Sequence, residues 1–426
     1  MVPQSPVTGG GKDPEKVKKV KRRPEYVIEE VSENPYYLAI SRKYKYAKLF
    51  TVALLVIYLL FMISTRRDDI TIENLRYMFK YIDVSPDGEE ASLTELLYDS
   101  DSELTLELYR GDVVSATSKA VTIYDAGGSS VMTSEEAFDN PVIRSSEKYL
   151  MVYDLGGDHF SIYNSFTQLY TESFSFPISC ADISDSSAFA VATRNLEYKT
   201  EVLFYDKNYK VVNRISKDKY AASLDLNPEG TELLLASFNV EGGDYYTEIM
   251  RLKAAETEPS LLFTISDTMP LEIAYTSDGG FSLLCDRGIC YYDEKGVKRG
   301  EMIFSGLPAD VYLGADYTVA VFNQNLVGYN NLVLVTDRSG NTVYRTYLKG
   351  QLVDIDVSGD DVFILLDGSV VKIALDSGHE ISEAVEKNTL QVLAAGDGAA
   401  VICYSNKASV CTFREGTETE TSEETN

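Results

Sequence analysis

Two cysteines separated by four residues are the sharpest chemical candidates in the sequence. Cys285 and Cys290 flank a short segment, DRGI, in which Gly288 is suited to the positive φ of a two-residue turn. A hairpin centred on Arg287 and Gly288 pairs Cys285 with Cys290 across two strands, within the reach of a disulfide. The prediction depends on the register, because a slip of one residue turns the two side chains to opposite faces. The alternative is that both are small buried core residues.

The remaining cysteines and the two histidines do not form a recognisable catalytic or metal-binding arrangement. Cys403 and Cys411 flank a second turn, where an in-register hairpin would also bring them face to face, and Cys180 has no obvious partner. His159 and His379 both lie in turn-like segments, where a zinc site or a histidine-based triad lacks further ligands or partners. Metalloprotease, esterase and phosphate-loop motifs are absent. We therefore assign no catalytic, cofactor-binding or metal-ligating residue, and the sequence favours a protein that is not an enzyme.

The charge is large and unevenly distributed. The 426 residues carry a net charge of −27, but residues 1–48 hold 11 basic and 6 acidic side chains, so the rest of the chain carries −32. An acidic globular part repels phosphate backbones, which argues against a nucleic-acid partner. The basic run at residues 16–23 is suited to contact anionic lipid at a membrane surface, or simply to fix the orientation of a membrane segment.

An uncharged apolar segment is the clearest signal for an element. Residues 49–65, LFTVALLVIYLLFMIST, lie between Lys48 and Arg66 and would span about 25 Å as a helix. We predict a transmembrane helix at residues 48–66, the alternative being a buried helix of a soluble domain. It starts too far into the chain, and lacks a small-residue cleavage site, for a signal peptide. The basic tail predicts a single-pass protein of the cell membrane with its N-terminus in the cytoplasm and its C-terminal domain outside.

The flanking segments are predicted from composition and periodicity. Residues 1–47 form a basic flexible cytoplasmic tail, and residues 416–426 form a disordered acidic tail without apolar content. Residues 67–90 join the membrane to the domain. Within them, residues 71–82 place Ile72, Leu75, Phe79 and Ile82 on one face of a short amphipathic helix.

Residues 91–415 carry a repeat that predicts the architecture. Short strands end repeatedly in an aromatic or aliphatic residue followed by a polar one, as at Tyr124-Asp125, Tyr205-Asp206 and Tyr292-Asp293, and eight such landmarks are spaced 38 to 46 residues apart. A second landmark, as at Asp182-Ile-Ser-Asp and Asp225-Leu-Asn-Pro, is interpreted as a turn within one unit. Units of this length are typical of β-propeller blades. We predict an all-β propeller, with eight blades favoured, seven as the alternative, and an irregular pair of β-sandwiches as the competing fold.

A propeller requires that its first and last blades meet, so the last blade must have a full set of strands. The last unit lacks a fourth strand, because the chain turns acidic immediately after it. The segment LTELLY, residues 93–98, is available from the other end of the domain to complete it. We predict that this segment closes the ring.

The anchor and the segments ITIENLRYMFKYID and PVIRSSEKYLMVYDLGGDHFSIYN resemble an uncharacterised family of single-pass bacterial membrane proteins with a propeller-like domain of unknown function. The resemblance covers nearly the whole chain after the tail and implies a fold of the broad quinoprotein and WD-like class, but no activity. A quinone-dependent dehydrogenase of that class stacks its cofactor on tryptophans. This chain has none, so no cofactor is expected.

These features together predict a membrane-anchored, extracytoplasmic binding or scaffold module. Its expected partners are the lipid bilayer and a protein or another component of the cell envelope. Two alternatives remain: a cell-envelope enzyme with carboxylates in the propeller channel, and a signalling or assembly subunit that works through the basic tail. With so many acidic residues after the anchor, the sequence does not select channel carboxylates.

Overall fold

The computed structural model describes residues 35–65, 95–325, 329–396 and 398–413. The chain divides into two compact units, Met1–Val84 and Ser85–Asn426. In the first unit the described element is helix α1, Pro35–Thr65. Among the residues described, no helix is long and apolar enough to cross a membrane. The predicted amphipathic helix at residues 71–82, the tail before residue 35 and the acidic tail at 416–426 lie outside the described residues.

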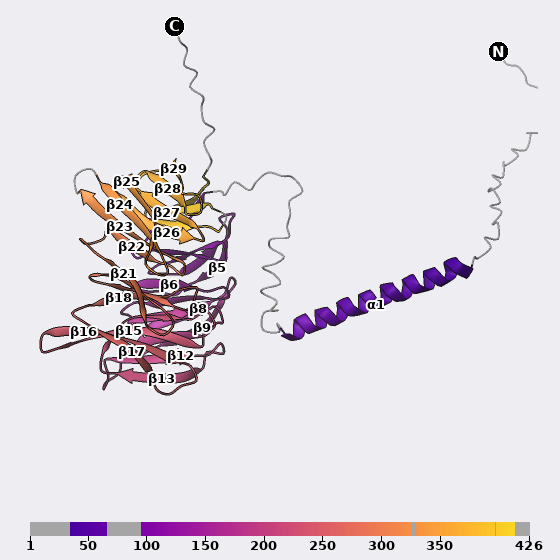
Figure 1. Ribbon diagram of the computed structural model, residues 1–426, viewed down its shortest axis with the longest axis horizontal. Coiled ribbons are helices and arrows are strands. Elements are labelled where there is room, and N and C mark those ends of the chain that lie inside the picture. The colour runs from indigo at the N-terminus through magenta and orange to yellow at the C-terminus, as the bar shows by residue number, and fades with distance from the viewer. Residues whose placement is uncertain (1–34, 66–94, 326–328, 397, 414–426) are drawn as a thin grey trace, which may run out of the picture. The chain divides into compact units, whose positions relative to one another are not determined.

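The second unit consists of eight antiparallel four-stranded sheets, which are the blades of a propeller. In blades 1 to 7 the four strands follow one another along the chain (Figure 1). The first strands of neighbouring blades pack against one another, so the first strand of each blade is innermost. Blade 1 contains β2 (Thr105–Tyr109), β3 (Asp112–Ala116), β4 (Val121–Tyr124) and β5 (Ser130–Ser134); blade 2 contains β6 (Pro141–Ser145), β7 (Leu150–Asp154), β8 (His159–Tyr163) and β9 (Gln168–Ser173). Blade 3 contains β10 (Cys180–Ile183), β11 (Phe189–Thr193), β12 (Thr200–Tyr205) and β13 (Val211–Lys217); blade 4 contains β14 (Tyr220–Leu226), β15 (Glu232–Glu241), β16 (Asp244–Lys253) and β17 (Ser260–Ser266).

The second half of the ring repeats this order. Blade 5 contains β18 (Pro270–Tyr275), β19 (Phe281–Cys285), β20 (Gly288–Tyr292) and β21 (Lys298–Ile303); blade 6 contains β22 (Asp310–Leu313), β23 (Tyr317–Asn325), β24 (Asn330–Asp337) and β25 (Thr342–Lys349). Blade 7 contains β26 (Leu352–Ser358), β27 (Asp361–Leu366), β28 (Ser369–Ala374) and β29 (His379–Ala384); blade 8 contains β30 (Gln391–Ala394), β31 (Ala400–Cys403), β32 (Lys407–Cys411) and β1 (Leu96–Leu97). The prediction of eight blades is confirmed.

Blade 8 is completed from the N-terminal end of the domain, as predicted. Leu96 pairs with Ala408 and Leu97 with Lys407, so that β1 is the outer strand of a sheet whose other strands come from the C-terminus. The Tyr98 hydroxyl donates to the carbonyls of Tyr404 and Lys407, at 2.5 and 2.6 Å. Because this sheet contains strands from both ends of the domain, it closes the ring and leaves no open sheet edge between the first and last blades.

The repeated landmark of the sequence is the turn between the third and fourth strands of a blade. At Asp125, Asp206, Asp293 and Asp337, Oδ1 of the aspartate accepts the backbone N–H groups two and four residues later, at 2.8 to 3.0 Å. The residue three positions after each aspartate has a positive φ. Since the aspartate supplies an acceptor for backbone donors that the turn leaves unpaired, it fixes the end of the third strand.

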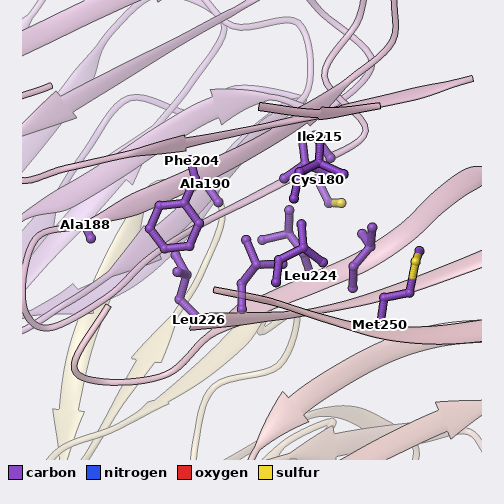
Figure 2. Close-up of a cluster of buried hydrophobic side chains, with 13 residues drawn as sticks. Cys180, Ala188, Ala190, Phe204, Ile215, Leu224, Leu226 and Met250 are labelled. Atoms are coloured by element: carbon purple, nitrogen blue, oxygen red, sulfur yellow. The ribbon is translucent and has the colours of Figure 1, made fainter. Parts of the chain in front are cut away.

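The core lies between neighbouring blades. The second strand of a blade is buried on both faces, as in β11 and β19, so its side chains contact one blade on each side. Figure 2 shows one such layer between blades 3 and 4, where Phe204 lies among Ala190, Leu224 and Leu226. Stacking around a ring therefore buries faces that a single blade leaves exposed.

The connections define two faces of the ring. The turns that join first to second and third to fourth strands lie on one, here called the turn face. The hairpins that join second to third strands, and the connections between blades, lie on the other, here called the loop face. Because β1 runs from Leu96 toward the hairpin before β32, the chain enters the ring at the turn face.

Candidate functional site: the central channel

Charged side chains converge on the ring axis from the innermost strands. Each of blades 1 to 7 contributes at least one, and all but one of these side chains are acidic: Glu107, Arg144, Asp182, Asp225, Glu272, Asp310, Asp354 and Asp356. Their electrostatic influence on one another links blades that are far apart in the sequence, as between Glu107 and Asp356 or between Arg144 and Glu272. The carboxylates are partly accessible to solvent, so the innermost strands line a polar channel.

Four of the carboxylates hold neighbouring inner strands together. Oδ2 of Asp182 accepts the N–H of Leu226 at 2.9 Å, and Oδ2 of Asp225 accepts the N–H of Tyr275 at 2.6 Å. On the other side of the ring, Asp354 and Asp356 accept the N–H groups of Val392 and Ala394 in the same way, at 2.9 and 2.7 Å. Adjacent inner strands do not pair as a sheet, so these bonds supply acceptors for their inward-facing backbone donors. This is a structural role.

Asp182 and Asp225 also interact with each other. Burial raises the pKa of Asp182, against the opposing effects of the Leu226 N–H and Arg144. Burial and the charge of Asp182 hold the pKa of Asp225 well above its ordinary value, and the two side chains are joined by a hydrogen bond. Two carboxylates in contact disfavour double ionisation, which is why the charge of Asp182 adds to the effect of burial on the pKa of Asp225.

Glu107 and Glu272 are different, because among the residues described neither makes a hydrogen bond or an ion pair. Both flank Arg144, whose described hydrogen bond is a long one to the Ile143 carbonyl, at 3.3 Å. Arg144 is exposed, so the loss of water that opposes its charge is only partial, and Tyr153, Asp182 and Glu272 raise its pKa. Burial raises the pKa of Glu272 against the effect of Arg144. Arg144 is therefore the cation that offsets the acidic lining.

Two channel carboxyls titrate near neutrality. Burial and the charge of Asp356 raise the pKa of Glu107 to about 7, with Arg144 opposing the shift. Burial raises the pKa of Asp354 to about 7, against the effect of the Val392 N–H. Such groups can donate or accept protons at physiological pH. In the part of the chain that the structure covers, no three acidic, histidine or cysteine side chains are arranged to hold a metal ion.

The predicted register of the cysteine hairpin is wrong. Cys285 pairs with Gly288 and Cys290 with Leu283, so the turn consists of Asp286 and Arg287. Gly288 does not have a positive φ. Glycine is needed there because the adjacent strand comes close, and a Cβ on residue 288 would overlap the carbonyl oxygen of Met302. That neighbour is a tertiary feature and shifts the turn by one residue.

The shift leaves Cys285 and Cys290 diagonal on one face of the hairpin. A diagonal pair is wider apart than a directly opposed one, and near the limit of what a disulfide spans. Both are free thiols in the structure and belong to the core cluster of blade 5. The bridge itself stays a prediction, checked by mass spectrometry of the unreduced protein.

The other candidate residues lie away from one another. Cys403 pairs with Ala408 and Cys411 with Ala400, so they do not face each other as the sequence suggested. Burial raises the pKa of Cys180 and Cys403 to about 12, which keeps them as unreactive thiols. His159 stacks on Phe138 in blade 2 with ring centroids 4.7 Å apart, and His379 begins β29 in blade 7.

The channel residues were not among those predicted from the sequence, although the inner strands carry a signal for them. Several inner strands carry a charged residue flanked by apolar ones, as in Leu106-Glu107-Leu108, Leu224-Asp225-Leu226 and Leu271-Glu272-Ile273. The landmark interpreted as a turn begins inside the inner strand, so that Asp182 and Asp225 face the axis and only the residues after them turn.

Residues 89–412 match the family model described as "Family of unknown function (DUF5711)". The chain belongs to this family. The match spans all eight blades, so the propeller is the part that defines membership. No curated protein matches the sequence.

Solved structures with a similar fold include two WD40 domains and the protein Sqt1. Sqt1 of Saccharomyces cerevisiae is 11% identical with a TM-score of 0.56, over 76% of this chain and 99% of that one. The C-terminal WD40 domain of Sif2 is 10% identical with a TM-score of 0.52, over 76% and 100%. The WD40 domain of SCAP from fission yeast is 9% identical with a TM-score of 0.51, over 74% and 96%. Likeness at these identities concerns the fold alone.

Proposed function

We propose that this chain is a membrane-anchored binding or scaffold module whose propeller lies outside the cytoplasm. The binding role is supported by the closed eight-bladed ring, which offers two wide, rigid faces. The channel carboxylates with the clearest contacts serve to join inner strands, which accounts for them without a reaction.

The apolar segment before the propeller carries the membrane part of the proposal. Residues 49–65 contain no charged side chain and fall within a single helix, α1. Among residues 49–58, whose side chains the structure describes, large apolar side chains such as Leu49, Phe50 and Ile57 are exposed to solvent rather than packed in a core. An apolar helix surface of this extent is normally covered by lipid or by a partner.

The orientation follows from charge. The chain is net positive before the apolar segment and strongly negative after it, and basic residues are retained on the cytoplasmic side. We therefore place residues 1–47 in the cytoplasm and the propeller outside, at the cell membrane.

A reporter enzyme that is active only outside the cytoplasm, fused after Asn426, tests the topology. We expect activity from the full chain and none from a variant with Val52, Leu55 and Val56 changed to Asp, which cannot enter the bilayer. A reporter that is inactive on the full chain, or a full chain that alkaline carbonate extracts from membranes, would overturn the anchor.

A second candidate function is an enzyme of the cell envelope that uses the channel. The observation that favours it is the pKa of about 7 for both Glu107 and Asp354. Turnover of model ester, phosphate or glycoside substrates by the purified chain, lost in Glu107→Gln and kept in Glu147→Gln, would support it. No turnover in the wild-type chain would leave the binding role.

A further inference from the structure

The loop face of blade 5 is bordered by projecting hairpins. The strands β15 and β16 of blade 4 have ten residues each, and β23 and β24 of blade 6 have nine and eight, whereas β19 and β20 of blade 5 have five each. In Figure 1 the longer strands project to the same side of the ring. Blade 5 is therefore recessed between its neighbours on this face.

A continuous strip of backbone connects these elements. The N–H of Asp267 donates to the Tyr245 carbonyl at 2.8 Å, and the N–H of Asp286 donates to the Met269 carbonyl at 3.0 Å. The N–H of Phe304 then donates to the Arg287 carbonyl at 3.0 Å. Hydrogen bonds thus link four segments into one surface. They are the β15–β16 hairpin, the connection from β17 to β18, the β19–β20 turn and the connection from β21 to β22.

That surface exposes large apolar side chains. Leu307 is 91% exposed and Ile303 is 73% exposed, and Val240, Met269 and Leu271, which belong to the segments joined by this strip, are exposed as well. We call these five residues the loop-face patch. Isolated exposed apolar residues are ordinary, but a group of five along one hydrogen-bonded strip is typical of an interaction site.

The charges around the patch are predominantly acidic. Glu241, Asp244, Asp267 and Asp286 are exposed, and among the described residues none of the four forms an ion pair. Arg287 is the basic residue in the same strip. Four carboxylates against one guanidinium favour a partner that brings positive charge.

We propose that the loop-face patch binds a protein segment in which apolar side chains are flanked by lysine or arginine. This rests on the binding role proposed above and specifies its surface. Anionic lipid and nucleic acid are repelled by the acidic rim. A symmetric contact with a second copy would bring like charges together, which disfavours self-association through this patch. The patch is also on the face opposite to the one where the chain enters the ring.

The test is photo-crosslinking of the full chain in the cells that produce it. Photoreactive benzoylphenylalanine replaces Leu307 or Ile303, and, as a matched control, Val297 on the turn face of the same blade, which is 60% exposed. We expect adducts from the first two positions and none from Val297. Mass spectrometry of the captured peptide should show apolar residues flanked by basic ones.

Charge reversal separates specific docking from general stickiness. Asp267→Lys with Asp286→Lys should lower the adduct yield at Leu307 roughly tenfold, while Glu229→Lys with Glu294→Lys, both on the turn face, leaves it unchanged. An acidic captured peptide, a peptide of this same chain, a lipid adduct, no adduct, or an equal yield at Val297 would each overturn the proposal. A cytoplasmic topology reporter would overturn the anchor without changing this result.

Discussion

The two faces of the ring are built from the same strands but differ in how their connections are stabilised. On the turn face, four aspartates bind the N–H groups of their own turns and set where each third strand ends. On the loop face, blades 4 and 6 extend long hairpins and the connections between blades expose apolar side chains such as Leu307. Large apolar residues exposed toward the turn face, such as Val211 and Val343, lie mainly on outer strands.

This difference indicates that the turn face contributes mainly to stability and the loop face mainly to binding. A turn whose donors are bound by its own side chains contributes to folding stability. A loop that leaves apolar residues in water gains nothing from them in the free protein, so their cost is offset only in a complex. We therefore expect substitutions on the turn face to change stability and those on the loop face to change binding.

The largest effect is expected where the ring closes. Deletion of residues 91–99 removes buried Leu96 and Tyr98 and leaves β32 as an open edge. Loss of buried side chains of this size costs about 2–5 kcal/mol each. The melting temperature of the full chain should fall by several degrees or more, measured by circular dichroism. The control Leu97→Ser, at an exposed position of the same strand, should melt like the wild type, and an unchanged melt after deletion would show that β1 does not close the ring.

A matched pair of glycines compares the two faces directly. Gly230 on the turn face and Gly242 on the loop face have nearly the same φ, 65° and 64°. A Cβ on Gly230 would overlap the hydroxyls of Ser184 and Ser186, whereas nothing lies within 4 Å of one on Gly242. Gly242→Ala should cost about 1 kcal/mol for the backbone alone, and Gly230→Ala at least about twice that. Equal unfolding free energies in urea would contradict the comparison.

The contact between Asp182 and Asp225 in the channel predicts that the stability of the fold depends on pH. Since the pKa of Asp225 is raised in the folded protein, its contribution is complete below the unfolded pKa, about 3.9, and is lost as the pH rises through the folded pKa. Asp225→Asn keeps an acceptor for the Tyr275 N–H and removes one ionisable group. The variant should therefore melt a few degrees above the wild type at pH 8 and lose this advantage toward pH 4. A wild type that gains stability between pH 5 and 8 relative to the variant would exclude a raised pKa of Asp225 in the folded protein.

A capping aspartate should show the opposite sign. Although burial opposes it, the Asn341 side chain and backbone lower the pKa of Asp337 in the folded protein. Its contribution is therefore present above the unfolded pKa and is lost as the pH falls through the folded one. Asp337→Ala should cost about 1 kcal/mol at pH 7 and almost nothing at low pH. The loop-face change Asp286→Ala, which removes one bond to the Met269 N–H, should cost less.

The smallest effect on stability is expected in the loop-face patch. Because Leu307 is almost fully exposed, Leu307→Ser should change the unfolding free energy by less than about 0.5 kcal/mol. Chemical unfolding of the wild type and the variant side by side checks this. A loss of 2 kcal/mol or more would show that Leu307 stabilises the fold, and the comparison of the faces would need another basis.

The sequence by itself determined the all-β class, the count of eight blades and the strand that closes the ring. The reason is that these follow from local rules: a strand that ends in Tyr and a turn that begins with Asp repeat wherever a blade repeats. The closing segment could be identified because the last unit was one strand short. A missing strand is visible in a count of strands.

Only the tertiary structure decided the channel and the cysteine register. Glu107, Arg144 and Glu272 meet at the axis although more than a hundred residues separate the first from the last, and no local pattern specifies which charged residue of an inner strand will find a partner across the ring. Gly288 looked like a turn residue because glycine suits a positive φ. In the folded blade the carbonyl of Met302 occupies the space of its side chain, and that contact with the next strand, rather than the hairpin's own sequence, places Cys285 opposite Gly288.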